Sequence, residues 1–145
     1  MKTVGISGEV EKFFGNESAF TPDDLEIARQ TALDSFAGGL TLNYRFNERQ
    51  LNLAAQHVER LEKLSDGLHA ANMYDLLKIY ELRERLTVAK VLIEHLKARR
   101  ETRWAGFAYN LDFPDRDEKF NCFVNSVTKG GKTKIIFREL EHDLH

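Results

Sequence analysis

The stretch from Met73 to Trp104 constrains the fold more than any other part of the sequence. Asn72 is suited to cap a helix that begins at Met73, and neither Gly nor Pro interrupts the stretch. Apolar side chains recur at alternating steps of three and four residues, which places them on one face of a helix. This stripe consists of Ile79, Leu82, Leu86, Ala89, Ile93 and Leu96, and it is widened by Leu76, Leu77, Tyr80, Val88, Val91 and Leu92. The sequence therefore predicts one long helix that contacts more than one neighbour and ends in an arginine-rich turn.

Two further helices are predicted upstream of this stretch. Residues 21–24, Thr-Pro-Asp-Asp, are typical of a helix start, and Gly38-Gly39 is typical of a helix end. Asn47 starts the next helix with Gln50 as its capping-box partner, and Asp66-Gly67 ends it. Because short connections favour antiparallel neighbours, the simplest core is an antiparallel three-helix bundle.

The remaining segments carry weaker helix signals. We expect an irregular N-terminal arm over residues 1–20 and an ordered loop over residues 40–46. Alternating apolar residues predict strands over Phe120–Val127 and Lys132–Phe137, joined through a Gly-containing loop. The predicted fold is mainly α, with the antiparallel three-helix bundle over residues 21–104. An aromatic and acidic loop, a C-terminal β-hairpin and a charged tail over residues 105–145 belong to the same domain.

Composition restricts the class of protein. The 145 residues carry a net charge of −2, which gives no reason to expect nucleic acid as a partner. No apolar run approaches the roughly 20 residues that span a bilayer, so we expect no membrane insertion. The single cysteine, Cys122, excludes an internal disulfide and favours a reducing cytoplasm.

Residues that could carry chemistry are sparse. No glycine-rich phosphate-binding motif is present, so no dinucleotide site is expected. The histidines have no carboxylate or cysteine at metal-ligand spacing, and we expect no metal site; they are His57, His69, His95, His142 and His145. Cys122 fits a small buried side chain better than a nucleophile. The acidic residues Asp112, Asp115, Asp117 and Glu118 fit a solvated turn better than an acid–base pair. No catalytic residue is assigned.

The basic turn after the long helix allows two interpretations. Arg99, Arg100 and Arg103, with Trp104, could face an anion or an acidic partner surface. Alternatively, these cations complement the negative end of the helix dipole in water, with Glu101 offering local pairing. The aromatic residues that follow exceed what a solvated loop requires, so they should pack on the helix end or on another protein; they are Trp104, Phe107, Tyr109 and Phe113.

Residues 98–126 resemble a pattern found in the flavoprotein subunits of the succinate dehydrogenase/fumarate reductase superfamily. In that family a helix ends in R-x-E-[ST]-R, and D-[FY]-P-x-R-D follows a few residues later. Arg99, Glu101, Thr102 and Arg103 match the first motif, and Asp112, Phe113, Pro114, Arg116 and Asp117 match the second. Residues 80–93 are similar to the preceding helix, and the resemblance extends over roughly residues 22–138.

The details of the resemblance point to one branch of the superfamily. Many succinate dehydrogenase-like members have Gly-Ala-His after the second arginine, whereas this chain has Trp104-Ala105-Gly106. The aromatic run and the segment Cys122–Ser126 look closer to the alpha subunit of adenylylsulfate reductase. The resemblance implies a C-terminal helical domain that packs on FAD-binding and capping domains. FAD and the main substrate contacts lie upstream of this region in the family, so the resemblance implies that this chain binds no cofactor itself.

Three functions stay open. The chain could be the C-terminal domain of an FAD-dependent oxidoreductase, acting in cis or in trans on the flavin-bearing part and without chemistry of its own. It could instead be a free-standing protein-interaction module on the same bundle, able to form a homo-oligomer. A third reading is a small enzyme that uses the basic turn and the acidic loop as an anion site.

Overall fold

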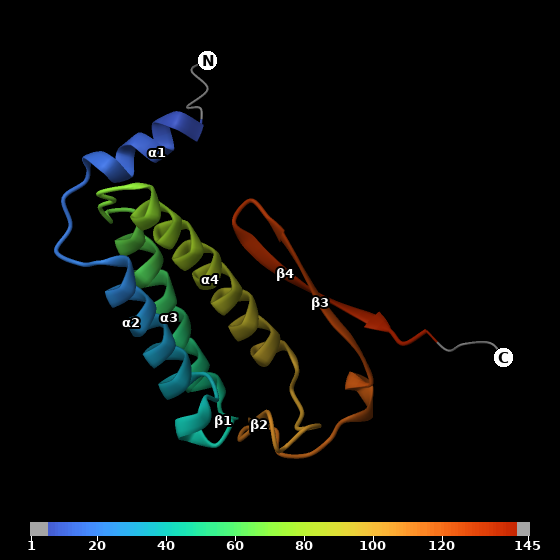
Figure 1. The fold of residues 1–145 in the computed structure, drawn as a ribbon. Coiled ribbons are helices and arrows are strands. Elements are labelled where there is room, and N and C mark those ends of the chain that lie inside the picture. Colours follow the sequence, from blue (N-terminus) through green and yellow to red (C-terminus); the bar gives the residue numbers. More distant parts are fainter. Residues whose placement is uncertain (1–5, 142–145) are drawn as a thin grey trace.

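The computed structural model describes residues 6–141 and the side chains from residue 8 onward. The structure is mainly helical and ends in a pair of strands (Figure 1). Its elements are α1 (Ile6–Gly15), α2 (Pro22–Phe36), η1 (Leu40–Leu42), β1 (Arg45–Phe46), α3 (Glu48–Ser65), α4 (Met73–Ala98), β2 (Tyr109–Asn110), η2 (Glu118–Phe120), β3 (Cys122–Lys129) and β4 (Lys132–Glu139).

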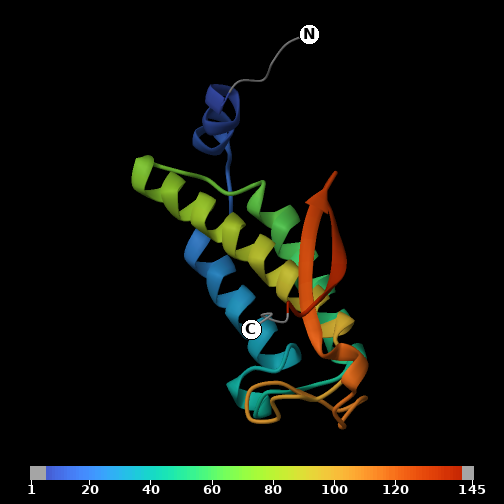
Figure 2. The same cartoon turned by 90° about the vertical axis from the view of Figure 1, so that its right-hand side faces the viewer.

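Helices α2, α3 and α4 pack on one another and enclose the core (Figures 1 and 2). Each begins at the cap that the sequence predicts: the side chains of Thr21, Asn47 and Asn72 accept hydrogen bonds from backbone N–H groups of the first turn. The predicted stripe of α4 faces the core, and five of its six residues are buried: Ile79, Leu82, Leu86, Ala89 and Ile93. Local capping and apolar periodicity therefore account for where these helices start and which face they bury.

The N-terminal arm is a correction to the sequence prediction, because residues 6–15 form helix α1 rather than an irregular segment. Phe13 is fully buried, and its ring meets the ring of Tyr80 edge to face at 6.0 Å. The N–H of Ala70 donates to the carbonyl of Phe13 at 2.8 Å. The Asn16 side chain donates to the carbonyls of Asp66 and Leu68 just after α3. These distant contacts stabilise a helix that its glycines would otherwise weaken. Residues 1–5 of the arm lie outside the described residues.

Two further details differ from the prediction. Helix α4 ends at Ala98 instead of near Trp104, because Arg99 has an extended backbone and its side chain binds carbonyls of the C-terminal segment. Gln50 does not complete a capping box: its N–H donates to Asn47, but its side-chain Oε1 is buried and finds no hydrogen-bond partner within the described residues.

The predicted C-terminal hairpin is present, with a shorter loop. Antiparallel pairing runs from Cys122 opposite Glu139 to Lys129 opposite Lys132, and only Gly130 and Gly131 lie between the strands. Their φ values of 57° and 74° belong to the left-handed region that a two-residue hairpin loop requires. The predicted loop over residues 40–46 contains η1 and the short strand β1, which pairs in parallel with β2. No helix within residues 6–141 is long and apolar enough to cross a membrane.

Candidate functional site

The arginine-rich turn at the end of α4 is organised around one buried carboxylate, Glu101. Its side chain has no exposed surface. Arg99 Nη1 lies 2.8 Å from Glu101 Oε1, and Arg103 Nε lies 2.9 Å from the same oxygen. Arg103 Nη2 donates to Oε2 at 3.2 Å. Two guanidinium groups therefore converge on one carboxylate, which is the arrangement that compensates a buried charge.

The pKa of Glu101 reports the strength of this arrangement. Burial alone would raise the pKa of the carboxyl group, but hydrogen bonds from Arg103, from the Asp117 backbone N–H and from Arg99 outweigh it and lower the pKa to about 2. Glu101 consequently stays charged at any physiological pH and keeps both arginines in place.

The segment that follows residues 99–103 is fastened to the same turn. The Asp117 N–H donates to Glu101 Oε2 at 2.9 Å, and the Thr102 N–H donates to the Asp115 carbonyl at 3.0 Å. The Thr102 hydroxyl accepts from the Asn110 N–H at 3.0 Å and donates to the Phe113 carbonyl at 2.8 Å. Residues 99–103 and 112–117, which the sequence presents as two separate motifs, thus form one structural unit.

Arg99 and Arg103 also hold the start of the hairpin. Arg99 donates to the carbonyls of Phe120 and Cys122 at 2.7 and 3.0 Å. Arg103 donates to the Asn121 side chain and to the Asp117 carbonyl, both at 3.3 Å. Much of the hydrogen-bonding capacity of these two arginines is therefore used inside the domain.

Arg100 and Trp104 have a different environment from Arg99 and Arg103. Arg100 is exposed, and its guanidinium carbon lies 5.9 Å from the centre of the Phe113 ring. Trp104 is 69% exposed. The structure places Arg99 and Arg103 inside the turn and leaves Arg100 and Trp104 facing outward.

Several large apolar side chains are exposed at this end of the molecule. In two views the loops 37–46 and 99–121 gather at the end of the helices away from α1 (Figures 1 and 2). We call the exposed apolar residues of these loops the aromatic surface; they are Leu40, Trp104, Phe107, Leu111 and Phe113. Phe107 is 77% exposed, although its ring lies 6.4 Å from that of Tyr44. Exposed apolar groups concentrated in this way are typical of a surface that another protein covers.

A small pocket opens beside the arginine turn. It has a volume of about 300 Å³ and lies between the end of α4, the 104–108 segment and the start of β3. Its walls include Phe46, His95, Arg99, Arg103, Trp104 and Phe123. The two arginines face Glu101 as well as the pocket, so one of their two positive charges is already compensated before any ligand enters.

The other residues that could take part in catalysis or metal binding either stabilise the fold or lie far from one another. Asp112 Oδ2 accepts from the Glu48 N–H at 2.8 Å and so supports the start of α3. The ring of His57 stacks on Phe36 at 5.4 Å, and Cys122 is half-buried. Among residues 6–141, no three His, Cys, Asp or Glu side chains gather at a geometry that could hold a metal ion. His142 and His145 lie outside the described residues.

Glu101 is the residue whose role was underestimated from the sequence. The available signal is its spacing, since arginines stand two residues before and two residues after it. In an extended segment, side chains two residues apart point to the same side, so all three can meet. The carboxylate also depends on the Asp117 N–H and on Arg99, which the Cys122 carbonyl of the hairpin strand helps to hold, and both Asp117 and Cys122 lie far along the chain.

Comparisons with known proteins show which family the chain resembles. Residues 44–144 match the family described as fumarate reductase flavoprotein C-term. The alpha subunit of adenylylsulfate reductase from Megalodesulfovibrio gigas is 31% identical over 124 residues, which cover 83% of this chain and 19% of that protein. An uncharacterized FAD-dependent oxidoreductase of Methanocaldococcus jannaschii is 29% identical over 98 residues, which cover 68% of this chain and 17% of that protein.

Solved structures give the same result. Adenylylsulfate reductase of Archaeoglobus fulgidus superposes with a TM-score of 0.83 at 26% identity, covering 91% of this chain and 21% of that one. Quinol fumarate reductase of E. coli has a TM-score of 0.81 at 16% identity, covering 97% of this chain and 24% of that one, and it supports the fold alone. The chain spans about a fifth of the length of the curated relatives it matches. The chain therefore belongs to the C-terminal domain family of the FAD-dependent flavoproteins that include succinate dehydrogenase, fumarate reductase and adenylylsulfate reductase.

Proposed function

We propose that this chain is a docking domain that packs on the flavin-bearing part of an FAD-dependent oxidoreductase and completes it, in cis or in trans. Redox chemistry then takes place on the other domains, and this chain supplies no catalytic residue. The observation that carries the proposal is the aromatic surface, because a domain that worked alone would expose Trp104 and Phe107 to water without compensation.

The arginine turn gives this surface a fixed shape. Arg99 and Arg103 tie the end of α4 to the segment before β3 through Glu101 and backbone carbonyls. Trp104 directly follows this rigid turn, and Arg100 lies within it. A preorganised surface binds more tightly because little conformational entropy is lost on docking. We therefore assign direct contact to Arg100 and Trp104, and a positioning role to Arg99 and Arg103.

The helices extend this role to the whole domain. We propose that α2, α3 and α4 act as an antiparallel bundle, and that the loops 37–46 and 99–121 form its docking end. The mutual packing of the three helices and the gathering of both loops at one end support this arrangement (Figure 1).

A replacement experiment tests the proposal. The segment of the M. gigas adenylylsulfate reductase alpha subunit that matches this chain is exchanged for residues 1–145, and purified protein is assayed for FAD per polypeptide. We expect the chimera to retain FAD, whereas the truncated subunit without the segment loses it. Capture of that truncated subunit by the tagged, separate chain is the corresponding test in trans.

Matched variants connect the result to the aromatic surface. Trp104→Ala combined with Phe107→Ser should reduce both FAD retention and capture. Met73→Ser combined with Tyr74→Ser removes two residues that are 69% and 66% exposed at the other end of α4, and it should leave both readouts unchanged. A chimera that loses FAD like the truncated subunit and a chain that captures nothing would refute docking. If the isolated chain bound stoichiometric FAD and turned over a substrate, the proposal that it supplies no catalytic residue would be refuted.

A further inference from the structure

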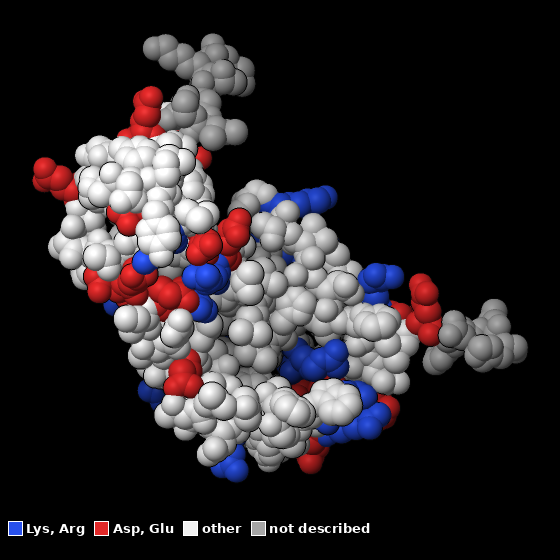
Figure 3. Space-filling model, in the orientation of Figure 1, with Lys and Arg blue, Asp and Glu red and all other residues white. Residues whose placement is uncertain are grey.

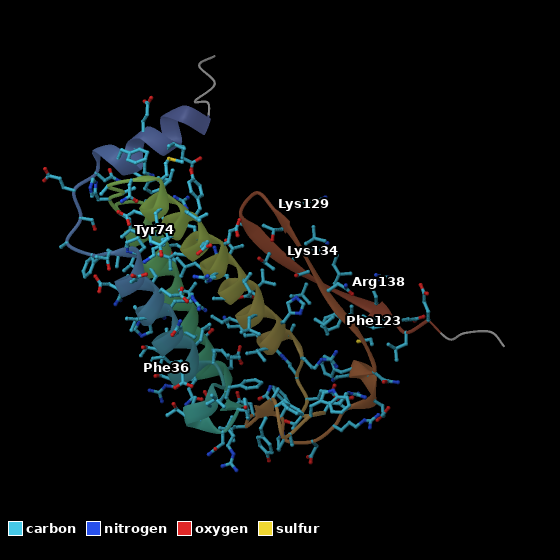
Figure 4. All side chains as sticks on the ribbon, viewed as in Figure 1. Phe36, Tyr74, Phe123, Lys129, Lys134 and Arg138 are labelled. Carbon is cyan, nitrogen blue, oxygen red and sulfur yellow. The ribbon has the colours of Figure 1, made fainter. Side chains whose placement is uncertain are left out.

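One face of the C-terminal hairpin carries cations and apolar side chains with no visible structural task. Successive side chains of a strand point to opposite sides, and along β3 half-buried residues alternate with exposed ones. The half-buried set packs against the rest of the domain, where both strands contact α4, and of the exposed set only Phe123, at the base of the hairpin, also borders the pocket beside the arginine turn. We call the exposed set the outer hairpin face; it consists of Phe123, Asn125, Val127, Lys129, Lys132, Lys134 and Arg138. Figure 4 labels four of these residues, which follow the hairpin from its tip to its base.

The charges of this face lack internal compensation. Within the described residues, Lys129, Lys134 and Arg138 take part in no ion pair, whereas helix cations such as Lys63 and Lys78 have carboxylate partners at 2.9 Å. The carboxylate of β4, Glu139, belongs to the opposite face, since it is paired with Cys122. In Figure 3 most Asp and Glu side chains gather on the helical part, among some cations, while Lys and Arg side chains stand out along the hairpin, with an acidic side chain at its C-terminal end.

Protection of an open strand edge explains only part of this pattern. The hairpin is a two-stranded sheet, and lysines on such strands discourage unwanted pairing. Protection would not require Phe123 to be 52% exposed or Val127 to be 41% exposed. Register places Phe123 directly opposite Arg138, and Val127 directly opposite Lys134. On this face Phe123 and Val127 are therefore each paired with a cation, whereas the exposed Phe137 of the other face lies opposite Val124. Such pairing fits a binding surface better than a protective one.

We infer that the outer hairpin face binds an acidic protein surface with apolar groups between its carboxylates. Charge complementarity selects the acidic partner, and the apolar side chains beside Lys134 and Arg138 select a protein over nucleic acid or a lipid headgroup layer. The chain as a whole carries a net charge of −2, so it lacks the general positive potential of a nucleic-acid or membrane binder. This interaction goes beyond docking on the flavin-bearing part, because the aromatic surface uses other residues.

Labelled synthetic peptides of defined composition are the probes for this inference. Binding to the full chain is measured by fluorescence anisotropy for three extended peptides, which alternate Glu with Val, Glu with Ser, or Lys with Val. We expect the Glu–Val peptide to bind most tightly, the Glu–Ser peptide more weakly and the Lys–Val peptide not at all. Added salt should weaken the binding of both acidic peptides.

Two variants of the hairpin and two controls locate the site. Lys134→Glu combined with Arg138→Glu should weaken Glu–Val binding about tenfold or more. Phe123→Ser should reduce the preference for Glu–Val over Glu–Ser. Lys63→Glu on α3 repeats the charge reversal outside the outer hairpin face, and Val88→Ser on α4 repeats the apolar loss; neither should change binding. Circular dichroism and melting temperature verify that each variant is folded.

The inference fails if no acidic peptide binds or if the hairpin variants bind like the controls. It also fails if single-stranded DNA, or vesicles of phosphatidylserine and phosphatidylcholine, bind the hairpin while the Glu–Val peptide does not. These assays contain no flavoprotein, so their failure would leave the proposed docking function unaffected, and the replacement experiment would not be affected by the hairpin variants.

Discussion

The arginine turn and the outer hairpin face have similar charges in opposite environments. At the turn, Arg99 and Arg103 converge on the fully buried Glu101 and on backbone carbonyls. On the hairpin, Lys134 and Arg138 point into solvent and have no ion-pair partner within the described residues. A basic cluster in a sequence therefore predicts an anion site only where no carboxylate of the chain reaches it first. This difference supports a stabilising role for Arg99 and Arg103, and it agrees with the binding role that we propose for the outer hairpin face.

The strongest test of this difference is Glu101→Gln. The amide keeps the size of the side chain but leaves two guanidinium groups without a compensating charge, and one amide hydrogen faces other donors. We expect the free energy of unfolding in urea to fall by about 3 kcal/mol. Glu118→Gln is the matched control, because its exposed carboxylate pairs with Arg116 and its loss should cost less than about 0.5 kcal/mol. Equal effects of the two substitutions would show that Glu101 is not the centre of the turn.

The second test is the dependence of stability on acid. The pKa of Glu101 is about 2 in the folded protein and near 4.5 when the chain is unfolded. A lowered folded pKa stabilises the protein fully above about pH 4.5, and this contribution is lost as pH falls toward 2. The loss should reach about 3 kcal/mol in the wild-type chain. Urea unfolding at several pH values should show a flatter profile for Glu101→Gln, and identical slopes would contradict the lowered pKa.

Thr102→Val tests how the two motifs are joined. The substitution removes the hydroxyl that accepts from the Asn110 N–H and donates to the Phe113 carbonyl. Because the region is buried, an unpaired N–H should cost about 2 kcal/mol in the free energy of unfolding. Thr87→Val is the control, since that hydroxyl is exposed and binds only the Arg83 carbonyl of its own helix. A Thr102→Val chain as stable as the control would mean that water replaces the lost bonds.

The same contrast explains how far the sequence alone predicts the fold. Helix starts follow from caps that act within one turn, as at Thr21 and Asn72, and the hairpin follows from alternation around Gly130-Gly131. Helix α1 could not be predicted from local sequence, because its stability depends on contacts of Phe13 and Asn16 with residues about fifty positions away. The early end of α4 depends on carbonyls 21 and 23 residues beyond Arg99.

In the candidate site, too, local features could be predicted from the sequence and long-range contacts could not. The spacing of Arg99, Glu101 and Arg103 is local, and together with the second motif it was enough to indicate the family. The burial of Glu101 is not local, because it requires Asp117 to donate its N–H from the second motif. Cations that lie in water and cations that clamp a buried carboxylate look the same in sequence, and only packing separates them. The sequence also left the role of the aromatic residues undecided, because packing on the helix end and packing on a partner require the same kind of side chain.

The smallest expected effect concerns the hairpin and has the opposite sign. Lys129 lies directly opposite Lys132 in the register, and like charges in that position destabilise a strand pair. Lys129→Glu should therefore raise the free energy of unfolding by about 0.5 kcal/mol. The same substitution should weaken binding of the Glu–Val peptide. Lys63→Glu breaks the pair with Glu59 and should lower the free energy of unfolding by a similar amount, without changing binding of the Glu–Val peptide. If Lys129→Glu destabilised the chain, the outer hairpin face would have a structural role like the arginine turn, and the distinction between the two basic clusters would not hold.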